Sequence, residues 1–260
     1  MGFVSANSGY IGVSQQPRAE NVAVIGRSAP VVVTSGLVLY LDAANPASYS
    51  GSGTTWTDLS GYNNHGTLGA GVTWDSGIAG GVMTLTATSG SSGQNITTTG
   101  PNLATSSNTV MGATRITNTA ISGRILNSLN NNWLLGHHNF LSNRHYAEGW
   151  ITDLSGGAGT NIPGIGVDTN WRIWTGWADY TNDSRALYDG LTLHFGPNSY
   201  GSQGPNGFRL GSFNTTSEFS SCQIGFLLAY NRALTYDEIM QNYYFFKNRY
   251  VPLYAADWPT

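Results

Sequence analysis

The sequence predicts an all-β protein, an antiparallel β-sandwich that carries one short C-terminal helix. The 260 residues include 34 glycines, and 12% are aromatic, which is typical of short strands joined by turns around an aromatic-rich core. Turn-forming clusters recur along the chain, as in residues 50–53 (SGSG), 60–64 (SGYNN) and 130–132 (NNN). Between them lie runs rich in β-branched and aromatic residues, a pattern that indicates a sandwich or barrel.

The first predicted strand lies in residues 36–42 (GLVLYLD). Alternation along this strand places Leu37, Leu39 and Leu41 on one face and the even-numbered residues on the other. Further strands are predicted within residues 82–88, 133–135, 171–177, 186–188, 191–195 and 223–230.

A helix is predicted from Thr235 onward. Thr235 and Glu238 have the spacing of a capping box, in which each side chain accepts a hydrogen bond from the backbone of the other. Pro252 is expected to end this helix. The apolar stripe at helical spacing consists of Ile239, Tyr243, Phe246 and Tyr250. We therefore expect the helix to pack on the sandwich.

Three segments follow from these patterns: an extended N-terminal arm (1–33), a β-sandwich domain (34–254) and a C-terminal tail (255–260). The arm is rich in Gly, Gln and Pro, and a compact domain does not need it. It is either a disordered tail or an element that becomes ordered on a partner, and we expect the second. Its apolar residues, singly spaced, are Phe3, Tyr10, Ile11 and Val13.

Composition excludes several classes of function. Charged residues make up 10% of the chain, the formal net charge is −3, and the single lysine is Lys247. Nucleic-acid binding requires a concentrated basic face, so we expect none.

No apolar stretch is long enough for a membrane span, and the N-terminus lacks a secretory signal. One cysteine, Cys222, excludes internal disulfides and is expected to be a small buried hydrophobe.

Three ordered motifs resemble one known family. The first comprises residues 36–43 (GLVLYLDA) with 56–68 (WTDLSGYNNHGTL); the second is 185–190 (RALYDG); the third is 224–239 (IGFLLAYNRALTYDEI). In this order they resemble the opening strand and turn, the central hairpin, and the closing strand and helix of concanavalin A-like domains of the laminin-G-like branch. The resemblance spans about residues 36–250 and implies a jelly-roll β-sandwich.

The resemblance also implies a biological context. Short domains of this kind without a signal peptide look like those of structural proteins of tailed bacteriophages, where they occur as fibres, capsid decorations or tail components. We therefore expect a non-enzymatic virion protein, made in the host cytoplasm. Its expected partners are other virion proteins through the arm, copies of itself, and a cell-surface glycan. The alternative is a free bacterial carbohydrate-binding module or lectin, against which the missing signal peptide argues.

Catalysis is not expected. Some relatives in the superfamily hydrolyse glycans with paired acidic residues, and glycoside hydrolysis needs two carboxylates at a set separation. The chain has four glutamates, and none has an acidic partner on the same predicted strand face. A hydrolase would require an acidic pair that meets only in space. The glutamates are Glu20, Glu148, Glu218 and Glu238.

Candidate glycan-binding residues come from the histidine- and tryptophan-rich middle of the chain. Adjacent residues on a strand point to opposite faces, so one of His137 and His138 should be buried while the other faces a groove. Trp171 and Trp177 share a strand parity that Trp174 does not, so the rings divide between two faces. The candidate residues are His138, Asn139, His145 and Trp177.

No cofactor is expected, with a loop calcium ion as the alternative. Some laminin-G-like relatives bind Ca²⁺ through loop carboxylates, and the resemblance makes Asp42 and Asp58, with Asp153, the nearest candidates. However, Asp58 lies in Asp-Leu-Ser-Gly, a sequence in which the carboxylate typically closes a turn onto its own backbone. We favour this structural role over metal binding.

Overall fold

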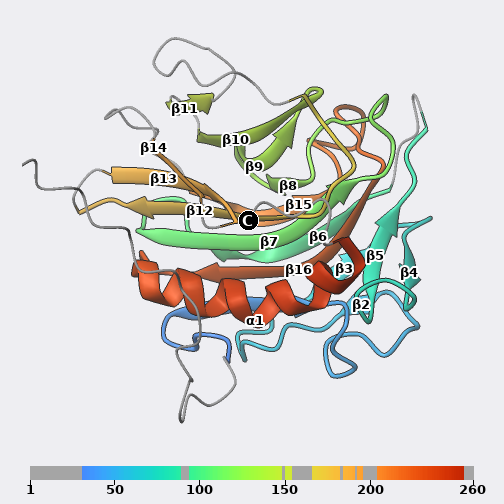
Figure 1. The fold of residues 1–260 in the computed structure, drawn as a ribbon, viewed down its shortest axis with the longest axis horizontal. Coiled ribbons are helices and arrows are strands. Elements are labelled where there is room, and N and C mark those ends of the chain that lie inside the picture. Colours follow the sequence, from blue (N-terminus) through green and yellow to red (C-terminus); the bar gives the residue numbers. More distant parts are fainter. Residues whose placement is uncertain are drawn as a thin grey trace, which may run out of the picture.

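The computed structural model describes residues 31–88, 94–147, 150–153, 166–181, 184–190, 192–195 and 204–254. These residues form two antiparallel sheets and one C-terminal helix, so the predicted all-β class is confirmed (Figure 1). The four apolar residues of the arm and the tail 255–260 lie outside the described residues. The predicted arm therefore stays a prediction.

The first sheet, sheet A, has the strand order β14-β13-β12-β7-β16-β5-β4, and β1 also pairs with β16. Its strands are β1 (Leu37–Asp42), β4 (Thr73–Asp75), β5 (Val82–Leu85), β7 (Asn108–Ile116), β12 (Arg172–Asp179), β13 (Ser184–Asp189), β14 (Thr192–Phe195) and β16 (Cys222–Tyr230).

The second sheet, sheet B, has the order β11-β10-β9-β8-β15-β6-β3-β2. Its strands are β2 (Thr55–Trp56), β3 (Gly66–Leu68), β6 (Ile96–Asn102), β8 (Leu126–Ser128), β9 (Trp133–His138), β10 (Leu141–Ala147), β11 (Trp150–Asp153) and β15 (Asn206–Leu210).

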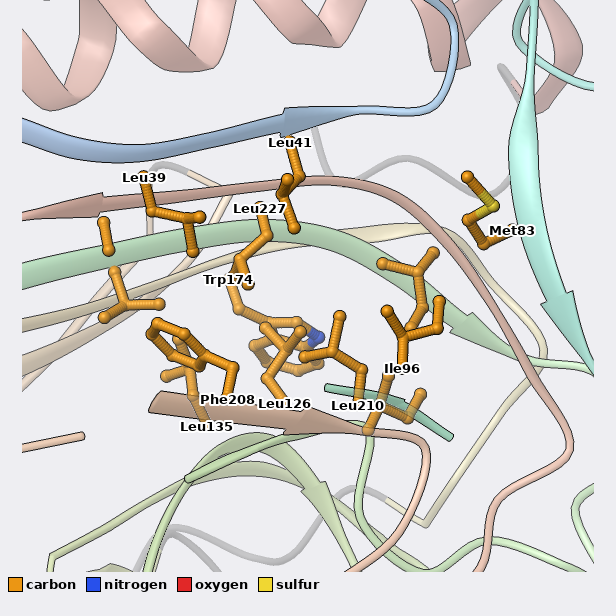
Figure 2. Packing of buried hydrophobic residues seen from close by; sticks show 14 of the residues in the cluster. Leu39, Leu41, Met83, Ile96, Leu126, Leu135, Trp174, Phe208, Leu210 and Leu227 are labelled. Atoms are coloured by element: carbon orange, nitrogen blue, oxygen red, sulfur yellow. The ribbon is translucent and has the colours of Figure 1, made fainter. Parts of the chain in front are cut away.

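The main hydrophobic core fills the space between the sheets (Figure 2). Its side chains are almost all inaccessible to solvent, so they hold the two layers together through the hydrophobic effect. From sheet A come Leu39, Leu41, Met83, Trp174 and Leu227; from sheet B come Ile96, Leu126, Leu135, Phe208 and Leu210.

A second core lies between the outer face of sheet A and α1 (Tyr236–Tyr254), which runs along that face (Figure 1). The Phe246 ring stacks on Phe226 of β16 with a centroid separation of 3.6 Å. The predicted apolar stripe is confirmed, because all four of its residues are buried in this core. Trp171 and Trp177 also belong to this side, and Trp174 to the main core, as their parity predicts.

The start of α1 agrees with the sequence, and its end does not. Thr235 N donates to Glu238 Oε2 at 2.9 Å and Glu238 N donates to Thr235 Oγ1 at 3.3 Å, so the capping box is confirmed. A hydrogen bond from Arg232 holds the pKa of Glu238 at about 2. The prediction that Pro252 ends the helix is wrong, since α1 continues to Tyr254. Pro252 has no N–H to donate to the carbonyl four residues earlier, and two further residues nevertheless keep the helical conformation.

Strand β16 changes its inward-facing parity at Gly225. The register between β16 and β7 shifts between Ile224 and Phe226, which is the signature of a β-bulge. Cys222 and Ile224 face the main core, whereas after the bulge Leu227 faces it instead. Every residue of β16 is buried, because one face meets sheet B and the other meets α1. Cys222 is buried and unpaired, as predicted.

A similar irregularity corrects the predicted face of β1. The register between β1 and β16 shifts between Leu37 and Leu39. Leu39 and Leu41 lie in the main core as predicted, but Leu37 lies in the helix-side core. The prediction that all three leucines share one face is therefore wrong for Leu37, because a one-residue slip exchanges the two faces.

The last residues assigned to the arm are fixed to the domain. Val33 is buried, and its N–H donates to Asn242 Oδ1 of α1 at 2.9 Å. The Tyr230 hydroxyl donates to the Val33 carbonyl at 2.9 Å, and Gln241 Nε2 donates to the Val31 carbonyl at 2.7 Å. Val31 and Val33, which the sequence analysis assigns to the arm, thus contact the domain.

Gly225 generates a prediction for stability. A Cβ at this position would lie 1.8 Å from the Tyr250 hydroxyl, closer than any relaxed contact allows. We expect Gly225→Ala to lower the free energy of unfolding by about 2 kcal/mol in urea titration, since overpacking a dense core has this cost. Adding Tyr250→Phe, which removes the clashing oxygen, should restore part of the loss.

The matched control is Gly166→Ala, because a Cβ there would meet nothing within 4 Å. If Gly225→Ala and Gly166→Ala lost equal stability, the close packing of Tyr250 against Gly225 would not be the reason for the glycine.

Candidate functional site

The turn between β9 and β10 consists of two residues in a left-handed backbone conformation. His138 pairs with Leu141, and between them Asn139 and Phe140 have φ values of 50° and 64°. Positive φ at both central positions is the requirement of a type I′ hairpin turn, and Asn suits the first position. A phenylalanine in the second position is unusual, because its Cβ crowds the backbone there.

Backbone hydrogen bonds from neighbouring loops hold this turn. Phe140 N–H donates to the Ser122 carbonyl at 3.0 Å, and Val167 N–H donates to the Phe140 carbonyl at 3.2 Å. The surroundings thereby fix a conformation that a phenylalanine does not favour by itself. Local strain of this kind tends to occur at functional sites.

Beside the turn lies a cleft of about 200 Å³. The Phe140 side chain, 55% exposed, forms part of its wall, so an apolar ring is presented to solvent where a ligand could contact it. The lining residues are Thr88, Ala120, Ile121, Ser122, Gly123, Asn139, Phe140, Glu218 and Phe219.

Glu218 supplies the charged group of the cleft. Its Oε2 lies 2.5 Å from Arg124 Nε and 3.4 Å from His138 Nε2. The hydrogen bond with His138 and the charge of Arg124 hold the pKa of Glu218 below its ordinary value, against the opposing effect of burial. Glu218 is therefore ionised at neutral pH and presents a hydrogen-bond acceptor to the cleft.

Arg124 holds the Glu218 carboxylate in position. Its side chain is 6% exposed, and its Nη1 donates to Asn127 Oδ1 at 2.9 Å and to Asn132 Oδ1 at 2.8 Å. The guanidinium also lies over the Phe213 ring, 4.1 Å from its centroid. Because a planar guanidinium satisfies several acceptors in a fixed geometry, the carboxylate that it contacts is held in place before any ligand arrives.

The structure brings together two of the four predicted glycan-binding residues. Asn139 lines the cleft, and His138 contacts Glu218 at its edge. His145 is fully buried, with its ring edge-on to Trp133 at 5.6 Å. Trp177 lies on the helix side of sheet A, where its Nε1 donates to the Leu234 carbonyl at 2.8 Å. These two residues are thus not part of the cleft, and all four assignments stay predictions for binding.

The predicted division of the adjacent histidines is confirmed. His137 is buried edge-on to the Trp174 ring at 5.2 Å, and burial lowers its pKa to about 3, so it is uncharged. His138 points the other way and is partly exposed beside Glu218.

Sequence reasoning missed Phe140, Glu218 and Arg124. The dipeptide Asn139-Phe140 follows a predicted strand, and a turn there was foreseeable from the asparagine. Nothing in the sequence signals that Arg124 and Glu218, 94 residues apart, form a pair.

The predicted calcium ligands hold the structure together instead. Both carboxylate oxygens of Asp42, which is fully buried, accept from Arg249 Nη1 at 2.6 and 2.7 Å. Asp58 accepts from the backbone N–H of Ser60 at 2.9 Å and of Asn64 at 2.9 Å, which is the turn-closing role favoured from sequence, and also from the Tyr40 N–H at 2.8 Å. A cation would have to displace these donors, so neither residue fits a calcium site.

Two further features are absent from the described residues. Within these ranges no three His, Cys, Asp or Glu side chains gather into a potential metal site. In the same part of the chain, no helix combines the length and apolar character of a membrane-spanning segment.

Comparisons with known proteins define the class of fold. No family model and no curated protein matches this chain. Among solved structures, domain 4 of AbnA, a GH43 extracellular arabinanase from Geobacillus stearothermophilus, in complex with arabinotriose, matches with a TM-score of 0.55 and 15% identity. That match covers 80% of this chain and 98% of the other.

Toxin binding domains also match. The binding domain of botulinum neurotoxin serotype D in complex with N-acetylneuraminic acid has a TM-score of 0.56 and 18% identity, over 81% of this chain and 51% of that one. The binding domain of Paraclostridial Mosquitocidal Protein 1 has a TM-score of 0.55 and 16% identity, over 80% of this chain and 52% of that one. The chain thus spans about half the length of the toxin domains. At these identities the likeness shows a common β-sandwich fold.

The Arg124 network generates a prediction. Arg124→Met leaves Glu218 without its guanidinium partner and leaves the Asn127 and Asn132 oxygens without their donor. We expect a loss of about 2–3 kcal/mol in the free energy of unfolding at neutral pH, measured by urea titration. The ionised Glu218 stabilises the fold above its unfolded pKa, and this contribution disappears as the pH falls. The difference in stability between Arg124→Met and the parent should therefore become smaller toward acid pH.

Arg124→Lys provides the comparison, because an ammonium group retains the charge but not the planar set of donors. It should recover only part of the stability. If Arg124→Met had the same free energy of unfolding as the parent at every pH, the network would be contradicted.

Proposed function

We propose that this chain is a non-enzymatic glycan-binding module and that the cleft beside the β9–β10 turn is its sugar site. One observation carries the proposal. An exposed aromatic ring, Phe140, lies in one cleft with a carboxylate, Glu218, that the fold holds in position. Sugars present apolar C–H faces and hydroxyl groups, and this pair is complementary to both.

The geometry assigns a role to each residue. The Phe140 ring would contact the C–H face of a sugar, since aromatic surfaces supply binding energy at a low cost in conformational entropy. Glu218 and the Asn139 amide would form hydrogen bonds with hydroxyl groups. The held turn and the buried Arg124 preorganise these groups, so less conformational entropy is lost when a ligand binds.

The charged surroundings of Glu218 support a non-enzymatic role. Retaining and inverting glycosidases use a pair of carboxylates across the scissile bond. Among the described residues, the side chains that pair with Glu218 are Arg124 and His138 rather than a second carboxylate. Two of the matching structures are also named as binding domains, and a third is domain 4 of an arabinanase in complex with arabinotriose.

The ligands of two matching structures support a glycan as the partner. One contains N-acetylneuraminic acid and the other arabinotriose. Fold alone does not define function, so this support is secondary to the cleft.

The wider context that we propose is the virion of a tailed bacteriophage, in which residues 1–30 attach the module to other copies or to other virion proteins. The resemblance of the three sequence motifs supports this context. The attachment of Val31 and Val33 to α1 provides a fixed exit point for such an arm.

The sugar site is tested by Phe140→Gly. Glycine takes the left-handed conformation without steric cost, and Asn-Gly is the preferred type I′ pair, so the variant should be at least as stable as the parent. Loss of the ring should weaken glycan binding about five- to tenfold, or about 1 kcal/mol, in calorimetric titration with a glycan identified on a neutral and sialylated array.

Tyr62→Ala is the matched control, because Tyr62 is 63% exposed and lies outside the cleft. Its affinity should equal that of the parent. Binding that survives Phe140→Gly would place the sugar elsewhere, and a failure to bind any glycan would overturn the proposed function.

The arm is tested by light scattering of the full chain beside a truncated chain that begins at Val31. This start keeps the hydrogen bonds of Val31 and Val33 with α1. The full chain should assemble, and the truncated chain should be a folded monomer. Replacing Phe3, Tyr10, Ile11 and Val13 with serine should have the same effect as truncation. Identical oligomeric states for all three chains would overturn the role of the arm.

A further inference from the structure

Among the described residues, the cleft contains one ionisable side chain. Of the nine lining residues that the structure describes, eight are uncharged, and the other is Glu218. A site for an anionic ligand normally presents arginine, lysine or a set of free backbone N–H groups. The lining of this cleft presents a carboxylate instead.

The neighbouring cation does not alter this balance. Arg124 is almost completely enclosed, with its Nε directed to Glu218 and its Nη1 to Asn127 and Asn132. Its charge compensates Glu218, so the pair contributes no net positive charge. An incoming carboxylate would meet Glu218 before it could reach the guanidinium, and like charges at short range in a partly buried site repel each other.

The second oxygen of Glu218 is available to a ligand. Arg124 Nε and His138 Nε2 both contact Oε2. In the described part of the chain, no donor contacts Oε1, and the side chain is 25% exposed. An ionised carboxylate only accepts hydrogen bonds, so its natural ligand group is a hydroxyl that donates.

The volume of the cleft sets the size of the ligand. About 200 Å³ is below the range of about 300–1,000 Å³ that is usual for drug-sized ligands. One sugar ring against Phe140 is compatible with this volume.

We propose that the cleft selects a single uncharged sugar ring, one hydroxyl of which donates to Glu218 Oε1, and that it rejects sugars that carry a carboxylate. This inference rests on the proposed function and specifies its ligand class. It distinguishes the chain from the matching structure that contains N-acetylneuraminic acid and places it with the one that contains arabinotriose.

The test compares sugars of both classes on the full chain. Arabinotriose and lactose are the uncharged probes, and 3′-sialyllactose adds a carboxylate sugar to the lactose unit. Calorimetric titration should give at least tenfold tighter binding for an uncharged probe than for 3′-sialyllactose. Affinity for the uncharged probe should be constant between about 20 mM and about 500 mM NaCl, since screening acts on charged ligands.

Ala120→Lys provides a gain of function. Ala120 lines the cleft, is exposed, and contributes only its backbone N–H to the Asn118 side chain, so a longer side chain leaves the Glu218 network intact. The added cation should increase affinity for 3′-sialyllactose at least fivefold and make it salt-dependent. Ala120→Gln is the neutral control: it adds a long side chain without a charge, so any change in affinity that it causes should not depend on salt.

The outcomes separate the two proposals. Tighter binding of 3′-sialyllactose than of lactose by the parent chain, weakened by salt, would overturn the selectivity and leave the glycan-binding function standing. Absence of binding to every neutral and sialylated glycan of the array would overturn both. Glu218→Gln should weaken binding of the uncharged probe about fivefold, because a neutral acceptor forms a weaker hydrogen bond. Unchanged affinity of this variant would exclude Oε1 as the acceptor.

Discussion

The burial of β16 on both faces is the constraint on which the rest of the structure depends. One edge of β16 pairs with β7, and the other pairs first with β5 and then with β1. Gly225 lies where β5 gives way to β1, and its carbonyl accepts from Ala43 N–H at 2.9 Å. The bulge at this glycine turns Phe226, Leu228 and Tyr230 toward α1, and it turns Leu227 and Ala229 toward sheet B. Without a change of parity, one of the two cores would receive the wrong side chains.

The ion pair between Asp42 and Arg249 completes this arrangement. It joins the end of β1 to α1 in a partly enclosed position, where the carboxylate has no access to solvent. The ion pair between Arg124 and Glu218 uses the same chemistry differently. Arg124 binds a carboxylate that remains accessible, so this ion pair prepares a surface rather than closing a layer.

Local signals in the sequence predicted local structure well. The capping box of α1, the turn at Asp58 and the opposite faces of His137 and His138 each depend on residues close together in the chain, and each was foreseeable. The bulges at Gly225 and beyond Leu37 were not, because register depends on the partner strand. The same limit applies to the cleft. His138 and Asn139 were found through a local motif, whereas Arg124 and Glu218 meet only after sheet B and its loops have formed.

The position of Cys222 has a practical consequence. This thiol is the single one in the chain, it is inaccessible to solvent, and burial raises its pKa far above its ordinary value. Thiol reagents react with the thiolate, so the native protein should be almost inert toward maleimides. A second cysteine introduced at the rim of the cleft would then be labelled alone, without removal of Cys222 from the core. A fluorophore attached there would report ligand occupancy in the otherwise unaltered protein.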